Sequence, residues 1–307
     1  MNNNELNNKK IFAAKFSIIS NSFLVAGKVF VGIITFSVSI IAEAIHSGID
    51  LIAAIIANYS VKKSAQPADE AHKFGHGKIE NISALIEGAL IFFAAYLILH
   101  EVYDKVLHGV HLEKLGIGIV IMLVSSISNY TISNYLFKVA KETDSAALGA
   151  DAWHLRTDVY TSVGVFTALL LIHFIKVPYI EYLDPLIAAI TAILIIRAGW
   201  EISREAVLNL ADMKLPSEEE ELIKKAIEEN PEKFLEFHNL RTRKAGPYKY
   251  IDLHLVVSKE LHVDKAHKLT HHLMADIKNK LPNTDIMIHL EPCNSMCEGC
   301  RIKCPKH

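Results

Sequence analysis

Six long runs of mainly apolar residues alternate with short polar segments over the first two-thirds of the chain. A helix that crosses the hydrocarbon core of a bilayer needs roughly 20 such residues, and each run is long enough. The pattern therefore predicts a membrane domain, residues 1–211, folded as an all-α bundle of six transmembrane helices. The predicted spans are residues 12–36, 39–61, 81–104, 115–138, 147–175 and 178–202.

Positive charges beside these runs predict the orientation. Lysine and arginine gather before the first span, between the second and third, and after the fourth and sixth, whereas the opposite connections are short or mixed in charge. Because cytoplasmic loops carry the excess of these residues, both termini are predicted to be cytoplasmic. The polar N-terminus has no cleavable signal, so we expect the first span to anchor a multi-pass protein in the inner (plasma) membrane.

The pattern changes from about residue 212, where charge rises and the apolar runs shorten. A capped helix with an acidic first turn is predicted at 216–229, and a second helix at 263–280. Alternating apolar and polar positions predict strands at 234–246, 249–257 and 284–292. This αββαβ order predicts a small cytoplasmic α+β domain, residues 212–292, followed by a cysteine-rich tail, residues 293–307.

Composition supports a membrane protein that handles metal. Of 307 residues, 51% are hydrophobic, and the mean hydropathy of +0.24 is high for a soluble protein. The net charge of -2 and the absence of a recognisable motif argue against nucleic acid as a partner. The 16 histidines favour transition-metal chemistry, with zinc as the expected ion and no organic cofactor.

A repeated motif in the second and fifth spans carries the predicted chemistry. The segments AEAIHSGID, residues 42–50, and ADAWHLRTD, residues 150–158, share the pattern A-[DE]-A-x-H-x-x-x-D. Residues four apart lie on one face of a helix, so each motif presents an imidazole and a carboxylate together. Two facing motifs supply the tetrahedral nitrogen and oxygen set that Zn²⁺ accepts. An ionisable group at this depth costs about 3 kcal/mol, which indicates function. The predicted ligands are His46, Asp50, His154 and Asp158.

These motifs, together with the loop PADEAHKFGHGKIE at 67–80 and the block HNLRTRKAGPYKYIDLHL at 238–255, resemble the cation diffusion facilitators. The resemblance implies a six-helix zinc/proton antiporter with a cytoplasmic ferredoxin-like domain. It implies that the four ligands form the transport site of a homodimer, which exports metal in exchange for protons by alternating access. A histidine at position 46 is similar to the zinc-selective members and unlike the oxygen-rich manganese ones.

The resemblance also suggests further metal sites, each with a simpler alternative. The spacing of Asp69, His72 and His76 suits a loop site, and the alternative is a solvated loop. Matching positions in the cytoplasmic domain form a regulatory site, and the alternative is a set of surface histidines. The residues at those positions are His238, His254, His267, His289 and Glu291, where aspartate is expected at the last position.

Two other features match the family in part. Lys78 and Asp212 lie at the positions of a charge interlock at the dimer centre. In the tail, the spacing C-x3-C-x2-C-x3-C-P suggests thiolate ligands for zinc or copper(I) on a loosely ordered segment that captures metal, and the alternative is a disulfide pair. The tail cysteines are Cys293, Cys297, Cys300 and Cys304, of which only the first matches the family.

Polar residues near the repeated motifs have two interpretations. Glu43 and Asp151 lie three residues before the site histidines, where they relay protons, orient the imidazoles or, as we favour, face water near a helix end. Arg156 must pair or extend towards the membrane surface. The amides of Asn21, Asn129 and Asn134 link helices or line a cavity.

Two other classes of protein remain as alternatives. A zinc hydrolase normally carries H-E-x-x-H, and the nearest string, HEVYD at His100, lacks the second histidine. A membrane-anchored metal sensor has no need for ionisable residues in its spans. Among transporters, Fe²⁺, Co²⁺, Cd²⁺ and Mn²⁺ are alternative substrates. Metal ions, protons, membrane lipid and a second copy of the chain are the expected partners.

Overall fold

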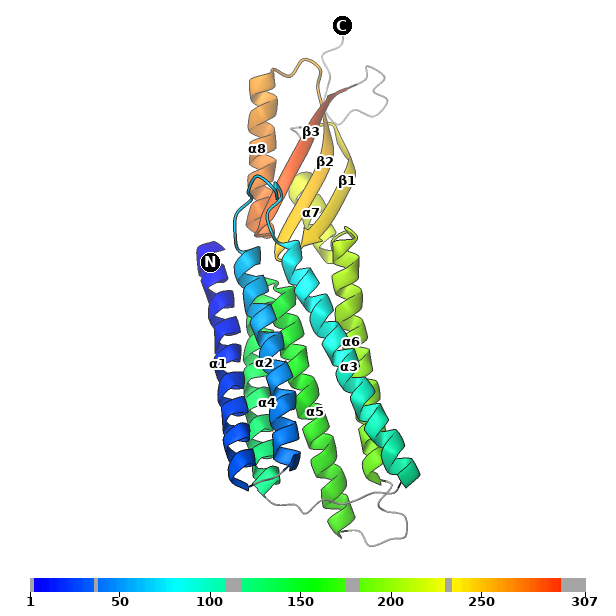
Figure 1. Cartoon of the computed structure of the whole chain (residues 1–307). Coiled ribbons are helices and arrows are strands. Elements are labelled where there is room, and N and C mark those ends of the chain that lie inside the picture. The colour runs from blue at the N-terminus through cyan, green and yellow to red at the C-terminus, as the bar shows by residue number, and fades with distance from the viewer. Residues whose placement is uncertain (1–2, 36–37, 109–116, 175–182, 230–233, 294–307) are drawn as a thin grey trace. The chain divides into compact units, whose positions relative to one another are not determined.

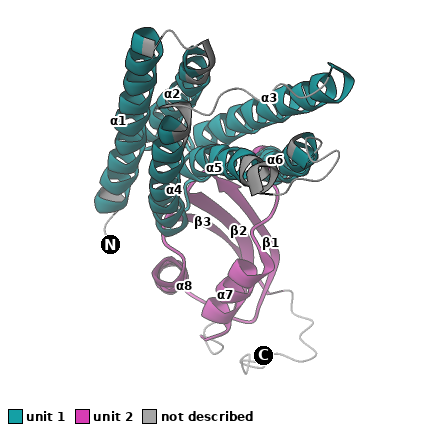
Figure 2. Ribbon diagram, turned by 90° about the horizontal axis from the view of Figure 1, so that it is seen from below, with its two compact units in different colours: residues 1–207 teal, residues 208–307 magenta. Residues whose placement is uncertain are grey.

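The structure, a computed structural model, describes residues 3–35, 38–108, 117–174, 183–229 and 234–293. The chain divides into two compact units, residues 1–207 and 208–307 (Figure 2). The first unit is built from helices and the second contains a small sheet (Figure 1).

Six long helices make up the first unit, one for each predicted span. Within the described residues, four segments are long and apolar enough to cross a membrane: Glu5–Ile34, Ala44–Ser64, Lys78–His108 and Pro185–Leu210. The helices are α1 Asn3–Thr35, α2 Val38–Ser64, α3 Lys78–His108, α4 Ile117–Thr143, α5 Ala146–Phe174 and α6 Leu183–Leu210.

Several helices extend beyond the apolar runs that predicted them. Helix α1 begins before its run, α2 continues past residue 61, and α6 continues past residue 202. Lysine, glutamate and arginine are good helix formers, so charged residues prolong a helix after it leaves the apolar region. The predicted span residues 36, 115–116, 175 and 178–182 lie outside the described residues.

Small residues allow the helices to pack closely. The core shared by α1, α2, α4 and α5 contains Ala13, Val61, Leu136, Leu148 and Ala152. Helix α3 lies beside α6 (Figure 2), and there Ile91 and Ala95 pack against Ile195. The bundle therefore encloses α5, which carries the second copy of the repeated motif and contacts α1, α2, α3 and α4.

A buried ion pair ties the bundle together at the end where residues 65–77 connect α2 to α3 (Figure 1). The Nζ atom of Lys10 lies 2.9 Å from Oε1 of Glu80, and the two side chains are only 1% and 0% exposed. The hydroxyl of Ser145, in the turn between α4 and α5, donates to Oε2 of Glu80. Ser60 of α2 donates to the carbonyl of Ile79, 2.9 Å away. Each of α1, α2 and α3 is thus held at this end.

The second unit confirms the predicted αββαβ order. Its elements are α7 Ser217–Glu228, β1 Glu236–Ala245, β2 Tyr248–Val257, α8 Val263–Lys280 and β3 Thr284–Pro292. The sheet order is β1-β2-β3, with β1 antiparallel and β3 parallel to β2. Alternate residues of β2 are buried. Apolar residues of the sheet, α7 and α8 form a single core, including Ile223, Ile227, Leu253, Leu273 and Ile277. The other face of β2, which carries His254, is only partly covered.

An irregularity in β1 changes the direction of its side chains. His238 pairs with His254, but Arg241 pairs with Asp252, so residues 239 and 240 together oppose a single residue of β2. Such a bulge inserts one extra residue and reverses the alternation beyond it. Asn239 has a positive φ of 51°, as bulges often require. On the far side of β2, His254 pairs with His289, so three histidines form a row across the sheet.

We predict that the buried pair of Lys10 and Glu80 contributes strongly to stability. Replacing Lys10 with methionine leaves an uncompensated carboxylate and should cost about 3–5 kcal/mol, whereas the double variant K10M/E80Q should recover much of this loss. The control is Lys9→Met, because Lys9 pairs with Glu142 at the surface and contributes less than about 1 kcal/mol. Unfolding curves in detergent measure both effects, and equal losses for the two lysine variants contradict the prediction.

Candidate metal sites

The repeated motifs on α2 and α5 face each other and form cross-pairs. The Nε2 atom of His154 lies 3.1 Å from Oδ1 of Asp50, and Nε2 of His46 lies 3.7 Å from Oδ1 of Asp158. Each pair joins an imidazole of one helix to a carboxylate of the other. The arrangement follows from the i, i+4 spacing, which gives each helix one nitrogen and one oxygen ligand on the same face.

Three of these residues already form a compact donor group. His46, Asp50 and Asp158 each offer a ligand atom, and these atoms lie within 4.8 Å of one another. His154 lies outside that triplet and contacts one of its members, Asp50, through its Nε2 atom. Within the described residues, the buried Nδ1 atom of His154 has no hydrogen-bond partner. A tetrahedral ion held by all four residues therefore requires His154 to move closer to the other three donors.

The group lies at a cavity of about 270 Å³, which is lined by residues of all six helices. His46 is 40% exposed, whereas Asp50 and His154 are only 5% and 4% exposed. The Nδ2 atom of Asn129 donates to Asp158 over 3.5 Å, so this amide both lines the cavity and links α4 to α5. A hydrated ion can therefore reach His46 through the cavity, whereas Asp50 and His154 behind it are shielded from solvent.

The cavity occupies one half of the bundle. Its residues on α3 lie between 94 and 105, in the C-terminal half of that helix, and those on α2, α4 and α6 lie in the N-terminal halves. All of these half-helices are at the end away from the 65–77 connection (Figure 1). The cavity includes Glu101 and Lys105, which form an ion pair at that end.

The structure corrects one expectation for the polar residues near the motifs. Asp151 does not face water, because it is 0% exposed. Asp151 lies in the second turn of α5, a helix that packs against α1 and α3. The side chain of Glu43 lies outside the described residues.

Arg156 was expected either to pair with another side chain or to extend towards the membrane surface, and in the structure it is paired. Its Nε donates to the hydroxyl of Ser133 at 3.1 Å and its Nη2 to the amide oxygen of Asn134 at 2.7 Å. The guanidinium also lies 4.8 Å from the centre of the Tyr130 ring. These contacts hold α5 against α4. Asn21 is buried on α1, and its Nδ2 has no hydrogen-bond partner among the described residues.

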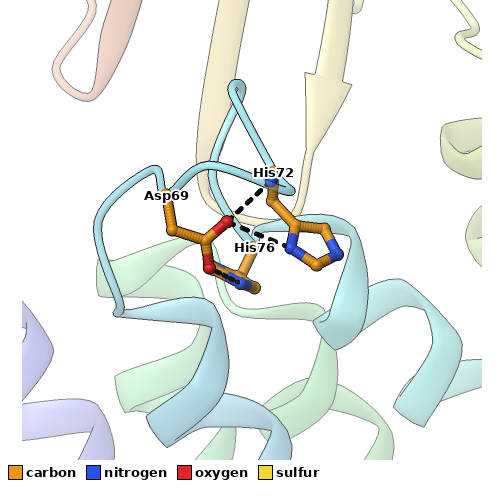
Figure 3. Close-up of side chains that lie close together, drawn as sticks. All are labelled: Asp69, His72 and His76. Atoms are coloured by element: carbon orange, nitrogen blue, oxygen red, sulfur yellow. Dashed lines mark hydrogen bonds and ion pairs between the residues drawn. The ribbon is translucent and has the colours of Figure 1, made fainter.

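The loop between α2 and α3 brings Asp69, His72 and His76 together (Figure 3). Each carboxylate oxygen of Asp69 lies 3.3 Å from one imidazole, with Oδ1 facing Nδ1 of His72 and Oδ2 facing Nε2 of His76. Gly75 has a φ of 77°, and its N–H donates to the carbonyl of His72. That turn returns the chain so that His76 faces Asp69.

Local hydrogen bonds prepare Asp69 for a cation. The backbone N–H of His72 donates to its carboxylate at 2.7 Å and holds the pKa of Asp69 below its usual value. The carboxylate of Asp69 therefore stays ionised to lower pH than an ordinary aspartate. His76 is buried, its Nε2 faces Asp69, and its Nδ1 has no hydrogen-bond partner among the described residues. Two imidazoles and one carboxylate form three of the four donors of a zinc site.

A third group lies on the open face of the sheet in the second unit. Glu291 is central, because its carboxylate lies 2.7 Å from Nδ1 of His254, 3.3 Å from Nε2 of His238 and 3.9 Å from Nε2 of His289. Ligand atoms of His238, His254 and Glu291 lie within 4.8 Å of one another. The longer glutamate arm at this position therefore reaches every histidine of the row.

The structure does not bring His267 into this group. His267 is exposed on α8, and its ring centre lies 4.4 Å from that of His271. The side of α8 that packs on the sheet is apolar, so a residue on its exposed side cannot reach the open face of the same sheet. His262, His271 and His272 are also exposed, as expected.

The remaining sequence candidates are described only in part. Lys78 begins α3 in the first unit, and Asp212 belongs to the second unit, where it pairs with Arg243 at 3.3 Å. Cys293 is buried with a free thiol. The other tail cysteines, Cys297, Cys300 and Cys304, lie outside the described residues.

Two family models match the chain. The cation efflux transmembrane domain matches residues 14–211, and the cytoplasmic domain of cation efflux proteins matches residues 215–293. Together the two matches cover all three candidate metal sites.

Several known proteins are similar over most of their length. The uncharacterised transporter sll1263 of Synechocystis sp. is 34% identical over 84% of this chain and 83% of its own. The cation-efflux pumps FieF of Serratia proteamaculans and Citrobacter koseri are 31% and 30% identical, over 86% and 92% of this chain and 87% and 92% of theirs.

Solved structures match about a quarter of the chain. One, on the mode of action of CzrB, a candidate zinc transporter by its own description, is 37% identical over 26% of this chain and 99% of that chain, with a TM-score of 0.25. The metal-bound C-terminal domain of the CzcD transporter from Thermotoga maritima is 23% identical over 26% of this chain and 93% of that chain, with a TM-score of 0.24.

We predict that Glu291 is the main ligand of the group on the sheet. Glu291→Gln removes the charge that faces three histidines and should weaken metal binding at this group by about tenfold or more. Glu260→Gln, an exposed carboxylate before α8, is the matched control and should change nothing. Calorimetric titration of the full-length protein with Zn²⁺ in detergent measures the difference. Equal affinities in the two variants argue against a metal site on the sheet.

Proposed function

The chain belongs to the cation diffusion facilitator family of cation efflux proteins, and from this premise we propose that it exports Zn²⁺ from the cytoplasm in exchange for protons. The protein is a multi-pass membrane transporter of divalent metal ions, as its relatives are. The choice of zinc, the counterflow of protons and the orientation in the membrane belong to the proposal.

One observation carries it: two copies of one motif, far apart in the chain, meet at the inner end of a cavity in a membrane domain. The cross-pairs of His154 with Asp50 and of His46 with Asp158 place four donors between two helices. Burying such groups in an apolar bundle is costly, and binding a cation offsets that cost.

The donor set favours zinc. Two imidazoles and two carboxylates suit a tetrahedral ion, whereas manganese prefers a set richer in oxygen. Fe²⁺, Co²⁺ and Cd²⁺ also accept nitrogen and oxygen donors, so their transport alongside zinc is compatible with the same site. The side chain at position 46 supplies the nitrogen that separates these preferences.

Competition for the same side chains explains proton exchange. Zinc binds neutral imidazole and ionised carboxylate, so metal and protons exclude each other. Histidine titrates near neutrality, with an unperturbed pKa of about 6.5, which lets a proton displace the metal without extreme acidity. In the proposed cycle the site takes zinc from the cytoplasm, releases it outside as one or two protons bind, and returns protonated.

The halves of the bundle support alternating access. The cavity reaches the site from the end away from the 65–77 connection, while Lys10, Glu80 and Ser145 close the opposite end with buried polar contacts. With both termini in the cytoplasm, this structure corresponds to an outward-facing form. Transport then requires the inner contacts to open as the outer cavity closes.

The other metal groups fit regulation. The loop group of Asp69, His72 and His76 and the sheet group around Glu291 lie outside the membrane spans, where they sense cytoplasmic metal. The protein acts as a homodimer in the inner membrane. Lys78 and Asp212 form its charge interlock, and the tail cysteines capture metal.

Two rival classes have less support. A zinc hydrolase requires a site that the HEVYD segment does not provide, because His100 is exposed at the end of α3 and lies 3.3 Å from Asp104. A membrane-anchored sensor does not account for buried metal ligands on α2 and α5. Flux measurements separate both classes from a transporter.

We predict that the transport site is essential for flux. In sealed proteoliposomes, Asp50→Ala and Asp158→Ala should each abolish Zn²⁺ flux and the accompanying proton counterflow, because neither leaves a complete donor set. Asp104→Ala, an exposed carboxylate on α3, should retain both fluxes. Zinc transport at the normal rate in both site variants would falsify the assignment.

Selectivity should follow the ligand at position 46. His46→Asp exchanges a nitrogen donor for oxygen and should raise the flux of Mn²⁺ and Cd²⁺ relative to Zn²⁺ by about tenfold. The comparison uses initial rates for Zn²⁺, Cd²⁺, Mn²⁺, Fe²⁺ and Co²⁺ in the same vesicles. If the order of metals does not change, ligand type at this position is not the selectivity filter.

A further inference from the structure

Two buried carboxylates, Glu87 of α3 and Asp151 of α5, have no place in the proposed transport site. Both side chains are 0% exposed. Neither oxygen of Asp151 has a hydrogen-bond partner among the described residues, and Oε2 of Glu87 has none either. The other oxygen of Glu87 lies 3.4 Å from the hydroxyl of Ser83. A buried carboxylate with so few hydrogen-bond donors is strongly destabilised unless a cation or a proton compensates its charge.

The two carboxylates lie together between α3 and α5. Ala84, one helical turn before Glu87, and Ala150, next to Asp151, pack against each other with Ala206 of α6. Glu87 lies close enough to Asp151 to feel the charge of that carboxylate. Ser17 of α1 faces Asp151, and its buried hydroxyl makes no hydrogen bond of ordinary geometry within the described residues. The group therefore offers unsatisfied oxygen atoms from three helices.

This group lies on the opposite side of the transport site from the cavity. Asp151 precedes His154 by three residues, about 4.5 Å along the helix axis, in the direction of the 65–77 connection. Neither carboxylate lines the cavity. On α3, Glu87 is followed by Ile91 and Ala95, which are buried against Ile195. The carboxylates are thus separated from the outer cavity by apolar side chains.

We infer that Glu87 and Asp151 form a waystation that binds the divalent metal ion before it reaches the transport site. The inference rests on the proposed export function and adds a second site to its cytoplasmic path. Carboxylate and hydroxyl oxygens bind divalent cations with little selectivity among them, and they carry no imidazole to favour zinc. The waystation therefore concentrates metal, and the neighbouring nitrogen-containing site selects it.

Metal concentration curves test the inference. Initial flux is measured in proteoliposomes containing the full-length protein, with metal supplied on the side of the N-terminus. Glu87→Gln and Asp151→Asn keep the shape of each side chain and remove its charge. Each variant should raise the KM by about tenfold, by a similar factor for Zn²⁺, Cd²⁺ and Mn²⁺, and should change kcat much less. The common factor distinguishes a waystation from the transport site, where a ligand change alters the order of metals.

Two controls separate metal binding from structural damage. Glu205→Gln alters an exposed carboxylate of α6 and should keep the wild-type KM. The exchange variant Glu87→Asp/Asp151→Glu retains both charges and should keep the KM within about threefold of the wild type. A rescue by this variant excludes the loss of packing as the cause.

The outcomes are distinct. An unchanged KM in both Glu87→Gln and Asp151→Asn overturns the waystation. If the KM is unchanged and only the pH dependence of flux changes, the two carboxylates bind protons and the waystation is likewise overturned. A raised KM in the exchange variant equal to that of the amide variants also overturns it. If the wild-type protein moves no metal, the proposed function itself fails, and this inference fails with it.

Discussion

The cross-pairing of imidazoles and carboxylates between α2 and α5 is the interaction on which the membrane domain depends. Four ionisable side chains are placed inside an apolar bundle, where none can be left alone without a large cost in free energy. Each pair therefore fixes α2 and α5 at one register relative to each other. Because α5 also contacts α1, α3 and α4, the remaining helices assemble around that register. The same constraint that stabilises the bundle also leaves a set of donors suited to a metal ion.

The three metal groups place similar ligands in different surroundings. The donors on α2 and α5 are partly dry, the loop around Asp69 is exposed except for His76, and the group around Glu291 lies on a half-covered sheet. An ion that enters the first group must lose most of its water, whereas the other two can bind one that stays partly hydrated. Exposure thus separates a site suited to passage from sites suited to sensing the surrounding solution.

Much of this architecture could be predicted from the sequence, because periodicity is a local property. The i, i+4 spacing predicted which side chains share a face of α2 and α5, and alternation predicted the strands of the second unit. Burial depends on neighbours distant in the chain, so Asp151 was expected to face water and is in fact enclosed. The central position of Glu291 and the separation of His267 from it likewise depend on strand pairing and on the side of α8 that packs on the sheet. Glu87 carried no sequence signal beyond being a charge within a predicted span.

The bulge in β1 determines which side chain of that strand lies opposite His254. Residues 239 and 240 oppose one residue of β2, and only for this reason does His238 lie beside His254 on the open face. If the same strand continued without the bulge from the pairing of Arg241 with Asp252, Asn239 would lie opposite His254 and His238 would turn towards the apolar core. A slip of one residue in this register would therefore remove a donor from the group while leaving the fold intact. Descendants of such a chain could lose metal binding on this sheet without any substitution at a ligand.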